Sequence, residues 1–268
     1  MNEKKLINIV INGTSDSKRI RRRLKTLFEN AGYTIAEGFD PGAELIVCIG
    51  GDGALLAMLS ENDFPTIPIV GINTGHLGFF QEVSSKGVAE FVFDYARGNY
   101  TKQVYRTVSA DVTCEDEITR IKGLNEIVIR GASSHSAHLS IFIGDSFIEQ
   151  FCGDGVVIST PAGSTAYNYS LRGSIVDPRL DLLQVTPIAP INSTAYRSFT
   201  SGILLPPDLS VGVFPEYPKS KEILVSADGF EKCFEGASEI RVAFNKESVT
   251  ILRFSEYDFW NTVKQKLL

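Results

Sequence analysis

The sequence predicts an α/β N-terminal domain with a Rossmann-like parallel sheet, followed by a β-rich C-terminal domain. Up to about residue 100, apolar runs alternate with helical patterns. The run 45–49 is unbroken, as expected for a strand buried on both faces of a parallel sheet, and 6–11 is expected to be a first buried strand. From about Thr101 the chain changes to short β-branched runs with a period near two, which is typical of antiparallel strands. We therefore predict domains at residues 1–100 and 101–254, and a C-terminal helix at 255–268 that packs back on the first domain.

In the N-terminal domain, most elements have their own start or stop signal. Polar residues after the first strand can cap a helix that Gly32 closes, and short strands are expected at 33–36 and 67–72. A further helix is expected from Ser84 to Gly98, with these apolar side chains on one face: Val88, Phe91, Val92 and Tyr95. The tail after residue 255 has a helical pattern that places three apolar residues on one face: Trp260, Val263 and Leu267.

The C-terminal domain consists of short runs with a strand pattern, separated by turn signals. Strands are expected at 104–112, 118–121, 127–129, 139–143, 156–158, 184–188, 209–213, 223–227, 240–244 and 250–254. Turns that contain proline are expected at 205–208 and 217–220. Antiparallel pairing of these runs would form the β-rich domain.

Composition and charge exclude several classes of protein. The 268 residues are 43% hydrophobic, which is typical of a globular protein with a full core. Acidic and basic residues are interspersed at a formal net charge of −6, so we expect no partner among nucleic acids and no membrane binding. No apolar run approaches the ~18 residues of a membrane span, so a cytoplasmic location is expected. The cysteines lack the close pairing with Cys or His that zinc sites use: Cys48, Cys114, Cys152 and Cys233.

A glycine-rich turn follows the strand at 45–49 and gives the clearest functional signal. Gly50, Gly51 and Gly53 lack a Cβ, which permits positive φ and close approach of a ligand to the backbone. A helix that begins just behind them would present free N–H groups, so the turn is predicted to be a phosphate loop. Asp52 lies within the turn, where a carboxylate repels a phosphate unless it holds a cation or meets a hydroxyl. The alternative is that Asp52 only caps the helix.

A second glycine-bearing loop follows the strand at 67–72 and could line the same cleft. Asn73 and His76 belong to this loop, and an orienting or packing role of His76 is favoured over catalysis. His135 and His138 lie in a serine-rich loop and are expected to be exposed to solvent.

In the C-terminal domain, Asn125 and Glu126 place an amide and a carboxylate at the head of an apolar strand. This position suits ribose hydroxyls or adenine edges, although the pair could simply begin a strand at the surface. Asp228 and Gly229 follow a later strand and are interpreted as an ordinary turn.

The stretch 153–171 is a stronger candidate for binding. Asp154 lies between two glycines, and after the next strand Pro161 and Gly163 force a turn. Ser164 and Thr165 can then cap a helix into Leu171, while Tyr167 and Tyr169 offer faces for stacking. We interpret this stretch as a second anion or nucleoside platform, with a plain turn and helix as the alternative.

Taken in order, these motifs resemble those of the NAD kinases: Gly50-Gly-Asp-Gly53, Gly71-Ile-Asn-Thr-Gly-His-Leu-Gly-Phe79, Asn125-Glu126, Asp154-Gly155 and Thr160-Pro-Ala-Gly-Ser-Thr-Ala-Tyr167. The resemblance covers nearly the whole chain, including 187–190 and 253–260, and is closest to the compact members from Gram-positive bacteria. The ordered set is highly specific, whereas a Gly-Gly-Asp-Gly turn alone also occurs in lipid kinases and phosphofructokinases.

The resemblance implies phosphorylation of the 2′-hydroxyl of the adenosine ribose of NAD, with ATP or polyphosphate as donor, to give NADP. It implies that Asp52 is the catalytic aspartate and that Gly50, Gly51 and Gly53 form the phosphate loop. The residues implied to bind NAD are Gly53, Asn125, Glu126, Asp154, Thr165, Ala166, Tyr167, Ser170 and Ala189. A homodimer or homotetramer is also implied.

Three positions depart from the family pattern. Ala54 replaces a common Thr, Ala162 replaces a frequent Thr or Ser, and Phe230 follows an Asp-Gly pair that is often followed by a polar residue. For this reason Asp228 and Gly229 are carried over only weakly.

Two other functions stay open at this point. A lipid kinase of the same superfamily would need an exposed apolar or membrane-binding face, and no basic amphipathic segment supports one. A catalytically silent NAD or NADP sensor is supported only by Ala54. For an active kinase we expect a requirement for Mg²⁺ or Mn²⁺ with unknown ligands, because no Lys is placed like a P-loop lysine to neutralise the triphosphate.

Overall fold

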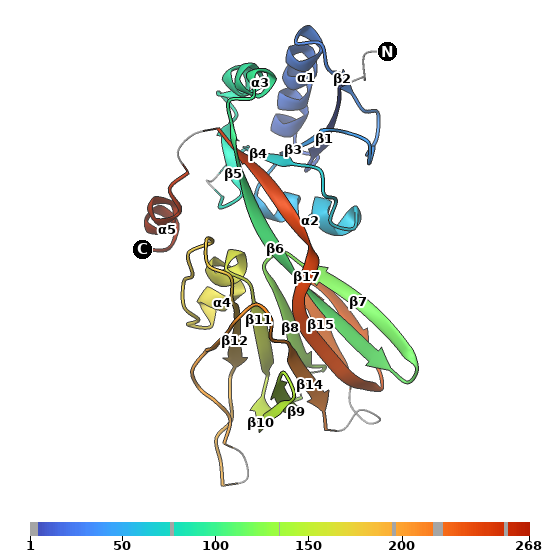
Figure 1. Cartoon of the computed structure of the whole chain (residues 1–268), viewed down its shortest axis with the longest axis vertical. Helices are drawn as coiled ribbons and strands as arrows, with labels where there is room; N and C mark the ends of the chain where they lie inside the picture. The colour runs from blue at the N-terminus through green and yellow to red at the C-terminus, as the bar shows by residue number, and fades with distance from the viewer. Residues whose placement is uncertain (1–4, 76–77, 134, 195–196, 217–221, 255–256) are drawn as a thin grey trace. The chain divides into compact units, whose positions relative to one another are not determined.

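The computed structural model describes residues 5–75, 78–133, 135–194, 197–216, 222–254 and 257–268 (Figure 1). The chain divides into two compact units, which are described separately: unit 1 is Met1–Tyr105 with Glu247–Leu268, and unit 2 is Arg106–Lys246. No helix in the described part of the chain is both long and apolar enough to cross a membrane.

Unit 1 is built on parallel strands: β1 (Leu6–Ile11), β2 (Thr34–Ile35), β3 (Leu45–Ile49), β4 (Ile69–Asn73) and β5 (Gln81–Ser84). The pairing order is β2-β1-β3-β4-β5, and the end of β17 (Ala237–Arg253) also pairs in parallel with β4. All residues of β3 are buried, which confirms the prediction from its unbroken apolar run. Because β1, β3 and β4 run in the same direction, the loops that follow them meet at one edge of the sheet.

The described part of unit 1 contains four helices: α1 (Ser15–Asn30), α2 (Asp52–Glu61), α3 (Val88–Arg97) and α5 (Phe259–Leu267). The Thr14 side chain accepts the Ser17 N–H and so caps α1, while Gly32 follows the helix at a φ of +86°. Phe28 of α1 packs edge-on against Phe91 and Tyr95 of α3 in the core.

Two expectations for these helices are wrong in detail. The helix expected from Ser84 begins at Val88, because Gln81–Ser84 is already paired with β4 as strand β5. In α5, Val263 is buried as expected, but the Trp260 residue is 50% exposed. The expected apolar face of α3 is buried in full.

Unit 2 consists of two sets of strands. One is a six-stranded sheet in the order β13-β12-β11-β8-β15-β16. Its strands are β8 (Glu126–Gly131), β11 (Gly155–Ser159), β12 (Leu183–Ile188), β13 (Ile203–Leu205), β15 (Ile223–Ala227) and β16 (Phe230–Phe234). In the other set, strands pair in the order β10-β9-β14-β17, and β6 pairs with both β17 and β7. The strands of this set not yet given are β6 (Thr101–Cys114), β7 (Glu117–Gly123), β9 (Ala137–Ile143), β10 (Ser146–Gly153) and β14 (Val211–Pro215).

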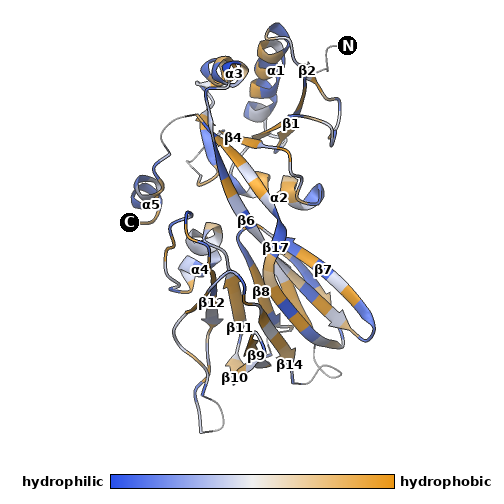
Figure 2. Ribbon diagram, in the orientation of Figure 1, coloured by the Kyte–Doolittle hydropathy of each residue, from blue (hydrophilic) through white to orange (hydrophobic). Residues whose placement is uncertain are grey.

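Side chains from both sets of strands form one buried cluster, which includes Ile127, Phe151, Ile158, Val213 and Val242. Hydrophobic residues run along β8 and β11 in the middle of the six-stranded sheet (Figure 2). The short helical segments η1 (Ala162–Thr165) and α4 (Tyr167–Ser170) follow β11. The expected α/β N-terminal part and β-rich C-terminal part are therefore confirmed as a fold class.

Some strands of unit 2 differ from expectation. The strands expected at 240–244 and 250–254 are one continuous strand, β17. The strands β10, β13 and β16 were not expected from the sequence. All three lie at ends of the strand orders, where exposed side chains dilute the apolar pattern. The turn expected at 217–220 lies outside the described residues.

Candidate functional site

Asp52 is the first residue of α2, directly after the glycine turn that ends β3. Gly51 occupies the N-cap position, and no side chain caps the helix. The Asp52 carboxylate instead accepts two backbone hydrogen bonds from another segment: Oδ2 from the Phe79 N–H and Oδ1 from the Phe80 N–H, both at 3.0 Å. The alternative that Asp52 only caps α2 is therefore wrong, since both oxygens are fixed by the segment that follows β4.

The glycines around Asp52 provide space rather than an unusual backbone conformation. Gly51 has a φ of −94°, and none of the three glycines of the loop has the positive φ that the sequence had suggested. A Cβ on Gly50 would lie 2.6 Å from the Ala54 Cβ, so this position must be glycine for packing. A Cβ on Gly51 or Gly53 would meet no atom within 4 Å, so the backbone there is open to a ligand.

A lysine from the C-terminal helix also reaches Asp52. The Lys266 Nζ lies 3.6 Å from Asp52 Oδ2 and 4.7 Å from the centre of the Phe79 ring. Lys266 comes from the C-terminal helix and not from the glycine turn, so it is not placed like a P-loop lysine. No motif signalled Lys266, because its position depends on where the C-terminal helix packs.

Arg253 supports the segment that holds Asp52. Its Nη2 donates to the Phe79 carbonyl oxygen at 3.3 Å, and its Nη1 pairs with Glu82 at 3.1 Å. The side chains of Arg253 and Glu82 are each only 3% exposed. Tyr257 also donates to the Phe79 carbonyl oxygen, at 3.3 Å, and its ring lies under the Arg253 guanidinium. Phe79 is thus held at its carbonyl while its N–H holds Asp52.

The second loop of unit 1 is described only in part. Asn73 is half-buried at the end of β4, and its Oδ1 accepts the Gly75 N–H at 2.7 Å. His76 lies outside the described residues, so its expected role stays a prediction. A Cβ on Gly78 would collide with Asp52 Oδ1 and with the Gln81 side chain, which explains a glycine at this position.

In unit 2, Asn125 and Glu126 are buried at the start of β8, with exposures of 6% and 5%. Within the described part of the chain, Asn125 Oδ1 and Glu126 Oε2 have no hydrogen-bond partner. Buried polar atoms are nearly always paired, so two unpaired oxygens side by side favour a hydrogen-bonding ligand over a plain strand start. Burial, and next the charge of Asp228, raise the pKa of Glu126 to about 8, while the Tyr167 N–H opposes this rise.

Asp228 is more than the ordinary turn residue that the sequence suggested. Its carboxylate accepts the N–H groups of Leu124 at 2.7 Å, Asn125 at 2.7 Å and Glu126 at 3.3 Å. Its own φ is +52°, so the backbone turns sharply to bring the carboxylate under this loop. Burial raises the pKa of Asp228, and the three N–H groups oppose the rise. Asp228 therefore fixes the backbone that carries Asn125 and Glu126.

The segment after β11 packs against the same loop. Thr160 Oγ1 donates to the Leu124 carbonyl oxygen at 2.7 Å, and a Cβ on Gly163 would collide with the Asn125 carbonyl. The expected helix capped by Ser164 and Thr165 is wrong: the segment forms two single turns without side-chain caps. Ser164 Oγ instead accepts the Val176 N–H at 3.0 Å. Around this loop, Thr165, Ala166 and Tyr167 are half-buried and Ser170 is exposed.

Asp154 and Ala189 lie together, but at the other end of β11. Gly155 pairs with Ile188 in antiparallel strands, so Asp154, which precedes Gly155, and Ala189, which follows Ile188, are neighbours. Both residues are exposed. Glu126 pairs with Ser159, five residues after Asp154. At about 3.3 Å per residue this separates the two groups by roughly 16 Å within one chain. The structure therefore brings the predicted NAD-binding residues of unit 2 into two groups rather than one.

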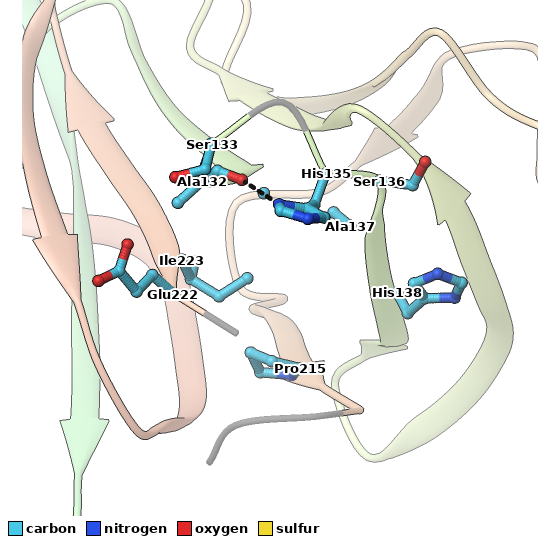
Figure 3. Close-up of a pocket in the computed structure, with 10 residues that line it drawn as sticks. Ala132, Ser133, His135, Ser136, Ala137, His138, Pro215, Glu222 and Ile223 are labelled. Carbon is cyan, nitrogen blue, oxygen red and sulfur yellow. Dashed lines mark hydrogen bonds between the residues drawn. The ribbon is translucent and has the colours of Figure 1, made fainter. Parts of the chain in front are cut away.

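A cavity of about 330 Å³ in unit 2 contains none of the predicted site residues (Figure 3). It is lined by the loop between β8 and β9, together with Pro215, Glu222 and Ile223. His135 is exposed as expected, whereas His138 is half-buried in the wall of this cavity, so that expectation is wrong for His138.

Comparison with known proteins supports the resemblance. The family model for the ATP-NAD kinase N-terminal domain matches residues 9–100, and the model for the C-terminal domain matches residues 124–254. The NAD kinase of Finegoldia magna is 35% identical over 271 residues, covering 100% of this chain and 99% of the relative. NAD kinase 1 of Oceanobacillus iheyensis is 30% identical over 264 residues, covering 97% of each chain.

Two solved structures share the fold. Yeast NADH kinase complexed with NADH has a TM-score of 0.84 at 20% identity, covering 100% of this chain and 88% of that chain. An NAD kinase from Archaeoglobus fulgidus in complex with ATP has a TM-score of 0.77 at 22% identity, covering 97% and 98%. Together with the two family models and the full-length relatives, these findings show that the chain belongs to the NAD kinase family.

Proposed function

We propose that the protein transfers the γ-phosphoryl group of ATP to the 2′-hydroxyl of the adenosine ribose of NAD, giving NADP and ADP. The observation that carries this proposal is the Asp52 carboxylate, fixed by two backbone N–H groups inside the family's Gly-Gly-Asp-Gly turn. A carboxylate held at both oxygens is preorganised to orient a hydroxyl and to accept its proton.

In the proposed step, the 2′-oxygen forms a bond to the γ-phosphorus while the bond from this phosphorus to the β,γ-bridging oxygen breaks. The electron pair of the broken bond leaves with ADP, and the proton of the 2′-hydroxyl passes to Asp52. Such a transfer depends on positioning and on charge stabilisation more than on a strong base. The free N–H groups at the start of α2, beside the open Gly51 and Gly53, would bind the phosphates.

Asn125 and Glu126 would hold the adenosine ribose of NAD. The unpaired Asn125 Oδ1 can accept a hydrogen bond from a ribose hydroxyl or from the adenine amino group. The Glu126 carboxyl can donate to or accept from a ribose hydroxyl, because a hydroxyl does both. The adenine would be surrounded by Thr165, Ala166 and Tyr167, with Ser170 at the rim. This segment lies beside the proposed ribose site, because the Tyr167 N–H donates to the Glu126 carboxylate. Asp154 and Ala189, at the other end of β11, would contact a different part of the dinucleotide.

A divalent cation, Mg²⁺ or Mn²⁺, would accompany the donor. The described residues contain no group of three His, Cys, Asp or Glu that could hold a metal ion on their own. In kinases, however, Mg²⁺ is held by one or two carboxylates together with substrate phosphates, and Asp52 can supply one such oxygen. Bound with ATP, the cation would neutralise phosphate charge.

We also propose a homodimer or homotetramer that works in the cytoplasm. Exposed apolar side chains on two edge strands support an oligomer. On β10, Phe147 is 55% exposed and Ile148 is 41% exposed, and on β13, Leu204 is 53% exposed. Exposed apolar residues on edge strands favour pairing with another chain. Light scattering coupled to size exclusion would measure the mass directly, and a monomer would contradict this part of the proposal.

A coupled assay for NADP tests the main proposal. Purified protein is incubated with NAD, ATP and MgCl₂, and an NADP-specific dehydrogenase reports the product. Turnover with NAD and none with diacylglycerol as acceptor is expected. Phosphorylation of the lipid would favour a lipid kinase, and tight NAD binding without any turnover would favour a silent sensor.

A further inference from the structure

Lys266 is a cation beside the reacting carboxylate that the family motifs do not account for. It belongs to the last turn of α5, and its Nζ lies 3.6 Å from Asp52 Oδ2. The side chains of Lys266 and Asp52 are 28% and 27% exposed, so solvent and ligands can reach both. The Lys266 Nζ also lies over the Phe79 ring, and this cation–π contact favours the position of the ammonium beside Asp52.

The contact with Asp52 alone does not explain this lysine well. Ion pairs that are partly exposed contribute only about 0–1 kcal/mol to stability. The separation of 3.6 Å is also longer than an N–H···O hydrogen bond, and each Asp52 oxygen already accepts a backbone N–H. An ammonium has three donors, and among the described residues none accepts a hydrogen bond from Lys266.

The charges around the glycine turn suggest what these donors bind. A donor phosphate placed at Gly51 and Gly53 lies close to Asp52, and two negative groups at this distance repel each other. The N–H groups of α2 carry only partial positive charge. Lys266 is the full positive charge that contacts Asp52 in the described part of unit 1.

We propose that Lys266 is a donor-binding residue, whose ammonium contacts the terminal phosphoryl group of a polyphosphate chain during its transfer. Without donor, the ammonium rests against Asp52. When the 2′-oxygen bonds to the terminal phosphorus and the bridging oxygen leaves with its electron pair, the ammonium keeps its protons and stabilises the equatorial oxygens. This role rests on the proposed kinase reaction for the fate of the phosphoryl group, but donor binding itself can be measured without NAD.

The first test is calorimetric titration of ATP with MgCl₂ into the parent protein, Lys266→Ala and Lys264→Ala. Lys264 is a matched control, because it lies in the same last turn of α5, carries the same charge and is exposed. Loss of a charge-assisted hydrogen bond should weaken ATP binding by roughly 10- to 100-fold in Lys266→Ala. Lys264→Ala should bind ATP like the parent. Equal losses of ATP affinity in both variants would mean that the charge of the helix, and not a contact of Lys266, supports binding.

A second comparison separates donor binding from orientation of Asp52. The same titration is made with Asp52→Asn and with the double variant Asp52→Asn/Lys266→Ala. If Lys266 contacts the phosphate, its removal weakens ATP binding in the Asp52→Asn background as well. If Lys266 only orients Asp52, its removal has no effect there, and the proposal is wrong.

Kinetics then distinguish this proposal from the proposed function. In Lys266→Ala, kcat/KM for ATP should fall at least about tenfold while KM for NAD stays within about twofold, because a donor contact is lost. Parallel assays with polyphosphate show whether the contact serves both donors. If the parent makes NADP and the Lys266→Ala variant is unaffected, only the role of Lys266 is refuted. A parent that binds ATP through Lys266 but makes no NADP refutes the proposed reaction alone.

Discussion

At the residue scale, Asp52 is held more firmly than a surface carboxylate needs to be. Two backbone N–H groups at 3.0 Å fix its oxygens, and a lysine faces one of them. Fixing both oxygens costs conformational freedom that is not recovered by helix capping, since Asp52 does not cap α2. The arrangement is understandable if the direction in which the carboxylate points matters for chemistry.

Replacing Asp52 by Asn tests this directly. The amide keeps one oxygen, so it can satisfy only one of the Phe79 and Phe80 N–H groups and faces the other with its own NH₂. We expect a stability loss of about 1–3 kcal/mol from the unpaired N–H, and a fall in kcat of about 10²-fold or more from the lost base. Turnover is measured well below the melting temperature, with NAD binding as the control for folding. Retention of most of the parent rate would remove Asp52 from the catalytic role.

Glu126 gives a pH signature. Its pKa is about 8 in the folded protein and near ~4.3 when unfolded, so the folded state holds a proton that the unfolded chain releases. The stability linked to this proton is fully present below the unfolded pKa and is lost as the pH rises through the folded pKa. In Glu126→Gln this dependence is absent. The free energy of unfolding of the variant, relative to that of the parent, should therefore increase between pH 5 and 8. The gain is on the order of a few kcal/mol, since one pKa unit corresponds to about 1.4 kcal/mol.

Urea unfolding at pH 5, 6.5 and 8 measures this difference for parent and variant in matched buffers. Other titrating groups are common to both proteins and cancel in the comparison. Parallel pH profiles of the two proteins would mean that Glu126 is ionised in the folded state at neutral pH, contrary to its burial beside Asp228.

Single residues of the site are predictable from the sequence where their chemistry and their local spacing coincide. Asp52 between glycines, and Asn125 and Glu126 before an apolar run, could be identified in this way. Asp228 was underestimated, because its partners at 124–126 are distant in sequence and only the pairing of β15 with β8 brings them together. The caps assigned to Ser164 and Thr165 failed because buried partners elsewhere and tight turns replaced the expected helix.

At the element scale, strands buried on both faces were the most predictable. The apolar runs at β3 and β4 need no polar face, so their pattern is unambiguous. Strand β16 exposes most of its residues, and β5 is only Gln-Glu-Val-Ser, so neither carries a clear apolar period. β17 was divided in two because its polar middle, 245–247, looks like a loop, although the strand continues through it.

The junction of β17 with β5 allows a test of positioning. Arg253 is the last residue of β17, and Glu82 of β5 is its buried partner. Arg253→Met should destabilise the protein by about 3–5 kcal/mol, because Glu82 is left buried without its counter-charge. The double variant Arg253→Met/Glu82→Gln should recover part of this loss, since Gln can still accept the Phe254 N–H. Thermal unfolding measures both.

Turnover of the double variant separates a positioning role of Arg253 from its contribution to stability. Its kcat should stay low despite the recovered stability, because the Phe79 carbonyl has still lost the Arg253 donor and the Asp52 contact is less well fixed. NAD affinity should not change, because the ribose contacts are proposed for Asn125 and Glu126 and not for the Arg253 segment. If kcat recovers together with stability, Arg253 serves the fold and has no role in positioning Asp52.

At the scale of the whole molecule, the family and the fold class could be predicted, while the assembly of the site could not. The ordered motifs extend through both family domains, which match residues 9–100 and 124–254. The supports of the site come from the end of the chain: Arg253 and Lys266 reach Phe79 and Asp52 across more than 170 residues of sequence. Contacts at such separation leave no local pattern, so they become visible only when the chain is folded.

We expect a requirement for a divalent metal as a property of the enzyme together with its donor. Asp52 can supply one oxygen to a divalent cation, so we expect the cation to bind together with the phosphates of the donor. Lys266 supplies one positive charge near Asp52, which is insufficient for the several negative charges of ATP. We therefore expect excess EDTA to abolish NADP formation and added MgCl₂ or MnCl₂ to restore it.

The melting temperature without ATP should be the same with and without EDTA, whereas removal of a structural metal would lower the melting temperature. Full turnover in excess EDTA would show that Lys266 and the N–H groups of α2 neutralise the donor without a cation, and a drop in melting temperature would show a metal site that the described residues do not form.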